Sequence, residues 1–291
     1  MNNIAIATDT NSGITADQAA ELGISVVAMP FTIQNETFHE GVDLSKEEFY
    51  SRLAEDADIS TSQPSPHDVL CLWDKLLQTH DSIIYIPMSS GLSGSCQAAR
   101  MLAEDYDGRV LVVDNQRISV TQRQSVLDAI QLRKVGKSAE EIVDTLMQTK
   151  LDASIYIMLD TLHYLKKGGR ITPAAAALGT VLRLKPVLQI QGEKADEFAK
   201  ARTINQAKSI MIAAIKNDIN KRFGGFEGEK NVWLHIAHSE NEEAAHTLKK
   251  ELEAEFPGYD IYVDHLALSI ACHIGPGSLA VACSVKLPVF P

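Results

Sequence analysis

The sequence predicts an α/β protein that is built around parallel β-sheet and divided into two domains. Its 291 residues exceed what one small hydrophobic core needs. Short runs rich in β-branched residues alternate with helical segments that carry capping signals. Between residues 82 and 114 a strand, a Gly-rich turn, a helix and a second strand follow one another, which is the order found in a parallel sheet.

Local signals at the ends of the segments define the elements of the first half. Gly23 ends the first helix, Ser45 with Glu48 has the spacing of a capping box, and Ser65 followed by Pro66 is typical of a helix start. The expected strands cover residues 3–8, 24–29, 82–87 and 110–114, and the expected helices cover residues 15–23, 45–56, 65–78 and 97–105, with one more that ends near residue 136.

The second half is also predicted to alternate strands with helices. Ser138 with Glu141 caps a helix, and Ser239 with Glu242 predicts another that runs to about residue 256. The other elements expected are strands at residues 154–159, 186–190, 232–237 and 261–263 and a long helix at residues 203–222. The Gly-rich segment 223–230 is typical of a surface turn.

Composition excludes several functional classes. A formal net charge of -11 and a pI near 5.3 disfavour a broad electrostatic grip on nucleic acid or anionic lipid. No run of about eighteen apolar residues is present, and the first residues lack a basic and apolar leader, so we expect a cytoplasmic protein without membrane insertion. The four cysteines are scattered and the histidines are not grouped with carboxylates, so reduced core thiols and no metal site are expected.

The segment SSGLSGS at residues 89–95 is the most informative local feature. It lies between a buried type of strand and a helix, where N–H groups and hydroxyls at the positive helix end favour a carboxylate or phosphate. Ordinary N-capping by serine explains the same residues equally well. Ser95 replaces the last glycine of a G-x-S-x-G elbow and no Walker lysine follows, so an anion cradle without a nucleophile is indicated.

Two other polar segments could contribute to binding. The loop STSQPSP at residues 60–66 holds hydroxyls between prolines that restrict the backbone, although such loops more often only cap a helix. Residues 275–280 have the spacing G-x-G-x-x-A, but Pro276 and the short remaining chain argue against a dinucleotide site. His273 could donate a hydrogen bond to an anion, whereas a lone histidine beside glycines is more often structural.

Basic side chains gather locally on this acidic chain. Lys166, Lys167 and Gly168 are explained by the C-terminus of a helix. Arg170 lies beyond that end and is better suited to a phosphate or a partner carboxylate, and Arg202 is a second local basic point.

Taken together, these segments resemble the DegV family of bacterial fatty acid-binding proteins. The resemblance rests on residues 61–66 (TSQPSP), 89–94 (SSGLSG), 165–171 (LKKGGRI) and 273–277 (HIGPG), with Thr8-Asp9 at the opening. It implies a DegV-like two-domain α/β fold, with an N-terminal three-layer α/β/α domain of mainly parallel sheet over residues 1–160 and a second α/β domain over residues 161–291. A fatty acid at the junction of the domains is implied as well.

The resemblance also implies roles for individual residues. The carboxylate of a long-chain fatty acid of the palmitate or oleate class would be held by the hydroxyls of Thr61 and Ser93. Gly94, His273 and Ser62 would assist. Basic positions that would contact a partner or a phosphate are Arg170, Arg202 and Lys167.

In this interpretation the chain has no catalytic residue and no cofactor besides its bound fatty acid. It is expected to present the acid to an ATP-dependent fatty acid kinase subunit and to carry fatty acid or acyl phosphate. Two alternatives remain open at this point. One is a stand-alone enzyme that handles a small anion or phosphate, and the other is a regulatory module that responds to lipid.

Overall fold

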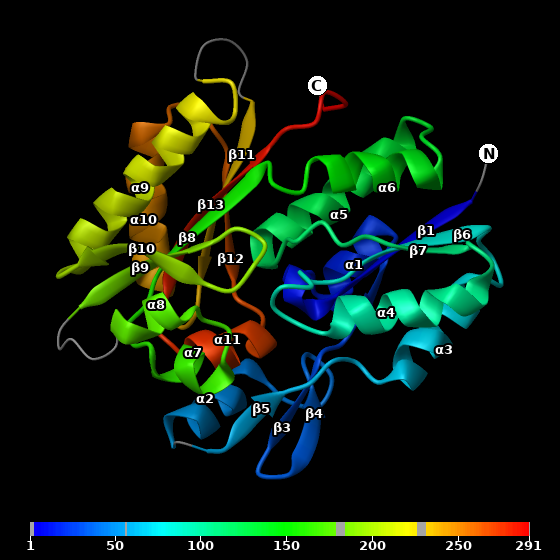
Figure 1. Cartoon of the computed structure of the whole chain (residues 1–291), viewed down its shortest axis with the longest axis horizontal. Coiled ribbons are helices and arrows are strands. Elements are labelled where there is room, and N and C mark those ends of the chain that lie inside the picture. The colour runs from blue at the N-terminus through cyan, green and yellow to red at the C-terminus, as the bar shows by residue number, and fades with distance from the viewer. Residues whose placement is uncertain (1–2, 56, 179–183, 226–230, 291) are drawn as a thin grey trace. The chain divides into compact units, whose positions relative to one another are not determined.

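A computed structural model describes residues 3–55, 57–178, 184–225 and 231–290 (Figure 1). The chain separates into two compact units, each of which is described here by itself. Unit 1 comprises Met1–Leu151, Ala267–Ser269 and Leu287–Pro291, and unit 2 comprises Asp152–Leu266 and Ile270–Lys286. Part of the surface turn expected at residues 223–230 lies outside the described residues.

Unit 1 is organised around a four-stranded sheet in which every pairing is parallel, with the strand order β2-β1-β6-β7. The strands are β1 (Ile4–Asp9), β2 (Ser25–Val27), β6 (Ser82–Ile86) and β7 (Val110–Val112). Both faces are buried because residues alternate between them: Ile4 and Ile6 point into one core, and Ala5 and Ala7 into another.

Helices cover both faces of this sheet, which confirms the three-layer arrangement (Figure 1). On the face of Ile4 lie α1 (Ala16–Leu22), α5 (Ser119–Lys134) and α6 (Ala139–Gln148), and on the face of Ala5 lie α3 (Pro66–Leu76) and α4 (Ser95–Ala103). The largest buried side chain is Trp73 of α3, which contacts Tyr85 of β6 edge to face.

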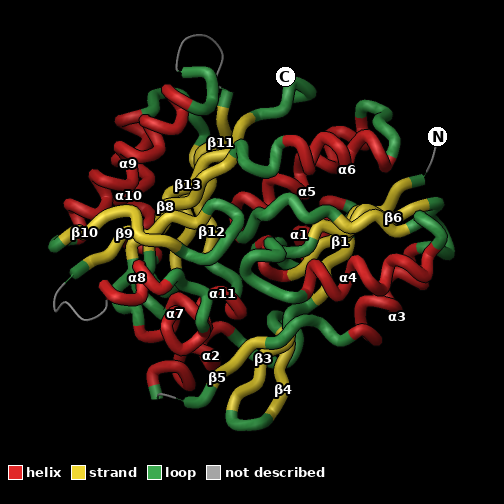
Figure 2. Tube along the Cα trace, in the orientation of Figure 1, coloured by secondary structure: helices red, strands yellow, loops and turns green. Residues whose placement is uncertain are grey.

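A second, three-stranded sheet in unit 1 was not predicted (Figure 2). It consists of β3 (Pro30–Ile33), β4 (Glu36–His39) and β5 (Ile59–Thr61), all antiparallel, and helix α2 (Lys46–Ala54) follows β4. Gln34 and Asn35 turn the hairpin with φ of 50° and 71°, as a two-residue turn requires. Neither residue is glycine, so the usual sequence mark of such a turn is missing.

Unit 2 contains a mixed six-stranded sheet with the order β10-β9-β8-β13-β11-β12, in which only β11 and β12 pair in parallel. The strands are β8 (Ala153–Met158), β9 (Lys185–Ile190), β10 (Asp196–Ala201), β11 (Val232–His238), β12 (Ile261–His265) and β13 (Leu279–Val285). The boundary expected after residue 160 lies beyond β8, whereas β8 belongs to unit 2 because it pairs with β9 and β13.

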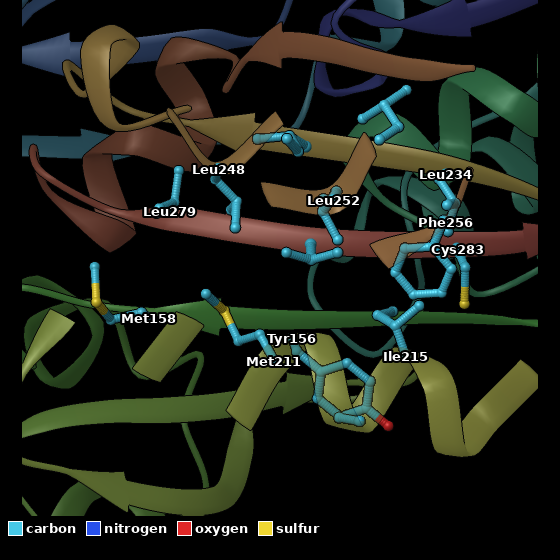
Figure 3. Close-up of a cluster of buried hydrophobic side chains, with 14 of the residues drawn as sticks. Tyr156, Met158, Met211, Ile215, Leu234, Leu248, Leu252, Phe256, Leu279 and Cys283 are labelled. Atoms are coloured by element: carbon cyan, nitrogen blue, oxygen red, sulfur yellow. The ribbon is translucent and has the colours of Figure 1, made fainter. Parts of the chain in front are cut away.

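Two long helices, α9 (Ile204–Lys221) and α10 (Glu242–Glu255), cover one face of this sheet. Figure 3 shows their side chains packed against the strands, with Met211 and Ile215 of α9 near Tyr156 and Met158 of β8. Three short helices complete the unit: α7 (His163–Gly168), α8 (Pro173–Ala177) and α11 (Leu268–Ile274), the last of which begins within unit 1.

The capping box predicted at Ser239 and Glu242 is wrong. Helix α10 begins at Glu242 with Asn241 at its N-cap, so Ser239 lies too far upstream to cap it. The Ser239 hydroxyl is fully buried and instead donates to the Gly275 carbonyl at 2.5 Å. By contrast, the predicted helix C-terminus at Lys166, Lys167 and Gly168 is confirmed, because α7 ends at Gly168 and Gly169 follows in the left-handed conformation.

Candidate functional site

The loop that carries Thr61 and Ser62 is fixed at both ends. Thr61 is the last residue of β5 and pairs with Phe31, and the Ser62 N–H donates to the Pro30 carbonyl at 3.2 Å. Ser65 closes the loop, since its hydroxyl accepts from the Asp68 N–H and caps α3. Thr61 is half-buried and Ser62 is exposed.

The turn at residues 89–95 folds back on itself before α4. The Ser89 carbonyl accepts from the N–H groups of Leu92 and Ser93, and the Ser93 hydroxyl accepts from the Ser95 N–H at 3.2 Å. Gly94 is the N-cap of α4 and supplies no side-chain cap. The result is a helix N-terminus at which Ser93 is the half-buried hydroxyl and Gly94 is exposed.

Gln63 brings these two segments together within unit 1. Its Oε1 lies 3.3 Å from the position that a Cβ at Gly94 would occupy. This proximity shows that the loop of Thr61 lies beside the turn of Ser93 within unit 1. No sequence pattern marks Gln63, because a contact between separate loops leaves no local signal.

His273 lies on α11 in unit 2, packed against the end of α7. A Cβ at Gly168 would lie only 2.1 Å from His273 Nδ1, so the imidazole occupies the space that a side chain would need. Burial, with a smaller effect from the nearby Arg170, lowers the pKa of His273 to about 4. The ring is therefore neutral at pH 7 and offers one N–H donor and one acceptor nitrogen.

The basic residues predicted to contact a partner or phosphate all belong to unit 2. Lys167 is exposed in the last turn of α7, and the half-buried Arg170 donates from its guanidinium to the Gly168 carbonyl. Arg202 is exposed directly before the N-cap Thr203 of α9, and its N–H donates to Gln206 Oε1 at 2.8 Å.

A buried acidic cluster at the end of β1 was not assigned a role from the sequence. Asp9 is fully buried and its carboxylate accepts from the N–H groups of Asn11 (3.0 Å) and Met88 (2.9 Å) and from Gln122 Nε2 (3.1 Å). Burial raises its pKa. Glu40 accepts from the Leu268 N–H at 2.6 Å, and burial raises the pKa of Glu40 to about 7. The Thr8-Asp9 pair at the end of a strand was the available signal.

The remaining chemistry of the described residues is limited. They contain no group of three or more His, Cys, Asp or Glu side chains arranged to hold a metal ion. Burial raises the pKa of Cys96 to about 12 and that of Cys272 to about 11, so both thiols are protonated at neutral pH. Within the same residues, every helix is too short or too polar to span a bilayer.

The structure is that of a two-unit α/β protein whose first unit carries the hydroxyl-bearing segments of Thr61 and Ser93 beside the N-terminus of α4. Residues 3–286 match the family model described as "Uncharacterised protein, DegV family". The chain therefore belongs to the DegV family. Similar sequences include a DegV domain-containing protein of Listeria innocua, 30% identical over 97% of this chain and 99% of its own length, and protein DegV of Bacillus subtilis, 28% identical over 98% and 100%.

Solved structures of relatives have the same fold. A DegV family protein from Thermus thermophilus, described for its fatty acid binding, aligns with a TM-score of 0.89 at 30% identity over 98% of this chain and 100% of its own. DegV from Bacillus subtilis, described as a fatty acid-binding protein, aligns with a TM-score of 0.86 at 28% identity over 98% and 100%.

Proposed function

We propose that this chain binds one long-chain fatty acid and holds its carboxylate with the hydroxyls of Thr61 and Ser93. The observation that carries the proposal is the approach of Gln63 to Gly94, which brings the loop of Thr61 against the turn of Ser93. The two relatives described as fatty acid-binding proteins supply the class of ligand.

The carboxylate is the demanding part of such a ligand. Burying a charge without partners is prohibitive, so the anion requires several donors in place before it binds. The Ser93 hydroxyl already accepts from the Ser95 N–H, which leaves its own O–H available to donate. The Gly94 N–H and the positive end of α4 add to this attraction, with Ser62 as a further donor.

The hydrocarbon chain supplies most of the affinity. An acid of the palmitate class has about fifteen methylene or methyl groups, worth roughly 12 kcal/mol of gross transfer free energy at about 0.8 kcal/mol each. Loss of translational and conformational freedom offsets several kcal/mol of this gain. The hydrocarbon chain therefore sets the affinity, and the polar groups around Thr61 and Ser93 select the head group.

The finer part of the proposal is that the chain presents the bound acid to an ATP-dependent fatty acid kinase subunit. Phosphoryl transfer belongs to that subunit, and this chain contributes positioning of the carboxylate oxygen. Arg170, Arg202 and Lys167 provide the positive charge for contact with the partner or with phosphate.

One double variant tests both the carboxylate contacts of Thr61 and Ser93 and the presentation of the acid to a kinase subunit. Thr61→Ala with Ser93→Ala removes two hydrogen bonds to a charged group, so palmitate binding by calorimetry should weaken about 100-fold. Acyl phosphate formation with ATP and a fatty acid kinase should be lost in parallel, and the chain alone should form none.

The matched control is Thr37→Ala with Ser51→Ala, two exposed hydroxyls of unit 1 on β4 and α2. This control should bind palmitate as the parent does. Unchanged palmitate binding by the Thr61 and Ser93 variant would show that these hydroxyls do not hold the carboxylate. If the parent binds palmitate but supports no acyl phosphate formation, only the kinase role is contradicted.

A further inference from the structure

We propose that the buried Asp9 carboxylate is a positioning residue that fixes the turn of Ser93 for its contact with the head group. This inference rests on the proposed function and assigns a further residue to the same site. Asp9 is the last residue of β1, and Ser93 lies in the turn after β6, which pairs with β1 in parallel. Because parallel strands end at the same edge of a sheet, a side chain at the end of one strand can hold the chain that leaves the other.

The contact that carries the inference joins Asp9 to the backbone directly after β6. Pairing of the two strands stops at Thr8 and Ile86, and Pro87 has no N–H with which to continue it. The next donor is the Met88 N–H, which donates to Asp9 Oδ2 at 2.9 Å. The Asp9 side chain therefore takes the place of a strand carbonyl and extends the connection between the two strands by one step.

Local capping explains only one of the two carboxylate oxygens. Asp9 Oδ1 accepts from the backbone N–H and the side-chain amide of Asn11, both at 3.0 Å, and from Gln122 Nε2 at 3.1 Å. The bond between Oδ2 and Met88 has no part in this local arrangement. All of these partners are donors, which suits an ionised carboxylate, and together they offset the unfavourable burial of the group.

Two further acceptors hold the next N–H groups of the same backbone. The Ser89 N–H donates to the Arg117 carbonyl at 2.9 Å, and the Ser90 N–H donates to Asp114 Oδ1 at 3.3 Å. The Ser89 carbonyl in turn accepts from the Ser93 N–H at 3.2 Å. Three successive N–H groups thus attach the turn to its surroundings, and the position of Ser93 follows from that attachment.

The segment 114–119, which supplies the second and third acceptors, is itself fixed. Gln116 and Ser119 have φ of 57° and 55°, in the left-handed region that residues other than glycine rarely adopt. Such conformations persist only where the surrounding structure holds them. Arg117 is buried, and its guanidinium donates to the Thr149 carbonyl at 2.7 Å. The turn is therefore attached to a rigid support, which suits a site that binds a charge without rearranging.

The negative charge of Asp9 acts in the opposite sense on an anionic ligand, because like charges repel. Asp9→Asn separates the two effects. Whichever way the new amide is turned, its NH2 group faces an N–H donor, so one attachment is lost together with the charge. Weaker binding of a carboxylate by this variant identifies the positioning effect, and tighter binding identifies repulsion as the larger effect.

Head-group preference is the measurement that tests the role of Asp9. Palmitate and hexadecanol, which have the same chain length, serve as the charged and the neutral probe in parallel titrations. In Asp9→Asn the dissociation constant for palmitate should rise about tenfold, while that for hexadecanol stays within about twofold. In a Ser93→Ala background, Asp9→Asn should change the palmitate constant by less than about twofold, because the hydroxyl that it positions is absent.

Asp218→Asn is the matched control, because Asp218 is also a buried carboxylate and accepts from the Tyr156 hydroxyl in unit 2. Its ratio of the two dissociation constants should equal that of the parent. The positioning role would be overturned by an unchanged ratio in Asp9→Asn, by tighter palmitate binding, by an equal loss for both probes in the folded variant, or by an undiminished effect in the Ser93→Ala background. Failure of the parent to bind palmitate would overturn the proposed function as well.

NMR relaxation of the ligand-free parent decides the question if Asp9→Asn does not fold. The backbone amides of residues 89–93 should have order parameters of about 0.85, as in a rigid backbone. Values below about 0.6 would show a turn that moves freely before the ligand binds, which contradicts positioning by Asp9.

Discussion

The glycine at position 168 allows the burial that keeps the ring of His273 neutral. Because glycine leaves room at position 168, the imidazole packs directly against the end of α7, where it is held away from water. The low pKa of about 4 follows from that burial and from the positive charge of Arg170. A neutral ring suits a site for an anion only through its single N–H, so any contribution of His273 is a hydrogen bond rather than a charge.

The pH dependence of stability provides a test at this residue. The His273 pKa is lowered from 6.5 to about 4 in the fold, so the unfolded chain takes up the proton first on acidification. The stability that this residue contributes is complete above pH 6.5 and declines as the pH falls toward 4, by roughly 3 kcal/mol in total.

The experiment compares urea unfolding of the parent and His273→Gln between pH 7.5 and about 4.5. The free energy of unfolding of the parent should fall relative to that of the variant as the pH decreases. Glu40, whose raised pKa acts in the opposite direction, is present in both proteins and cancels in the difference. Parallel curves would contradict the buried, neutral assignment of His273.

Elements with clear end signals are the ones that the sequence predicts correctly. The capping box of Ser138 and the N-cap Ser65 both start helices where expected. The three-stranded sheet escapes prediction because its strands are only three or four residues long and are bounded by Pro30 and by a turn without glycine. Ser239 and Glu242 have the spacing of a capping box, but the Ser239 hydroxyl forms its hydrogen bonds with Gly275 and Ser278 instead.

Two single variants separate the predicted role of Ser239 from the observed one. Ser239→Ala should lower the free energy of unfolding by about 1–3 kcal/mol, because the Gly275 carbonyl loses its donor and the buried Ser278 hydroxyl loses a partner at 2.6 Å. Glu242→Ala should change it by no more than about 0.5 kcal/mol. Equal effects of the two substitutions in chemical denaturation would favour the capping box instead.

At the scale of the whole molecule, the α/β class was predictable from the alternating elements, and the resemblance to the DegV family implied the three-layer first unit. The order of the strands in unit 2 was not predictable, because β13 comes from the C-terminal end of the chain yet pairs with β8 and β11 inside the sheet. Residues 267–269 and 287–291 also belong to unit 1, and no local sequence pattern predicts this assignment.

The candidate site divides in the same way. The hydroxyl-rich and glycine-rich segments stand out in the sequence, and the resemblance to the DegV family assigns Thr61 and Ser93 within them. The contact of Gln63 with Gly94 joins two loops that are separate in the sequence, so only the folded structure reveals it.

Native mass spectrometry of the purified chain, followed by organic extraction and identification of any released lipid, tests the central claim most directly. The proposed function predicts one long-chain fatty acid per chain, or stoichiometric uptake of added palmitate or oleate by protein purified without lipid. A chain that emerges empty and takes up neither acid would contradict fatty acid binding and favour a small anion as the ligand.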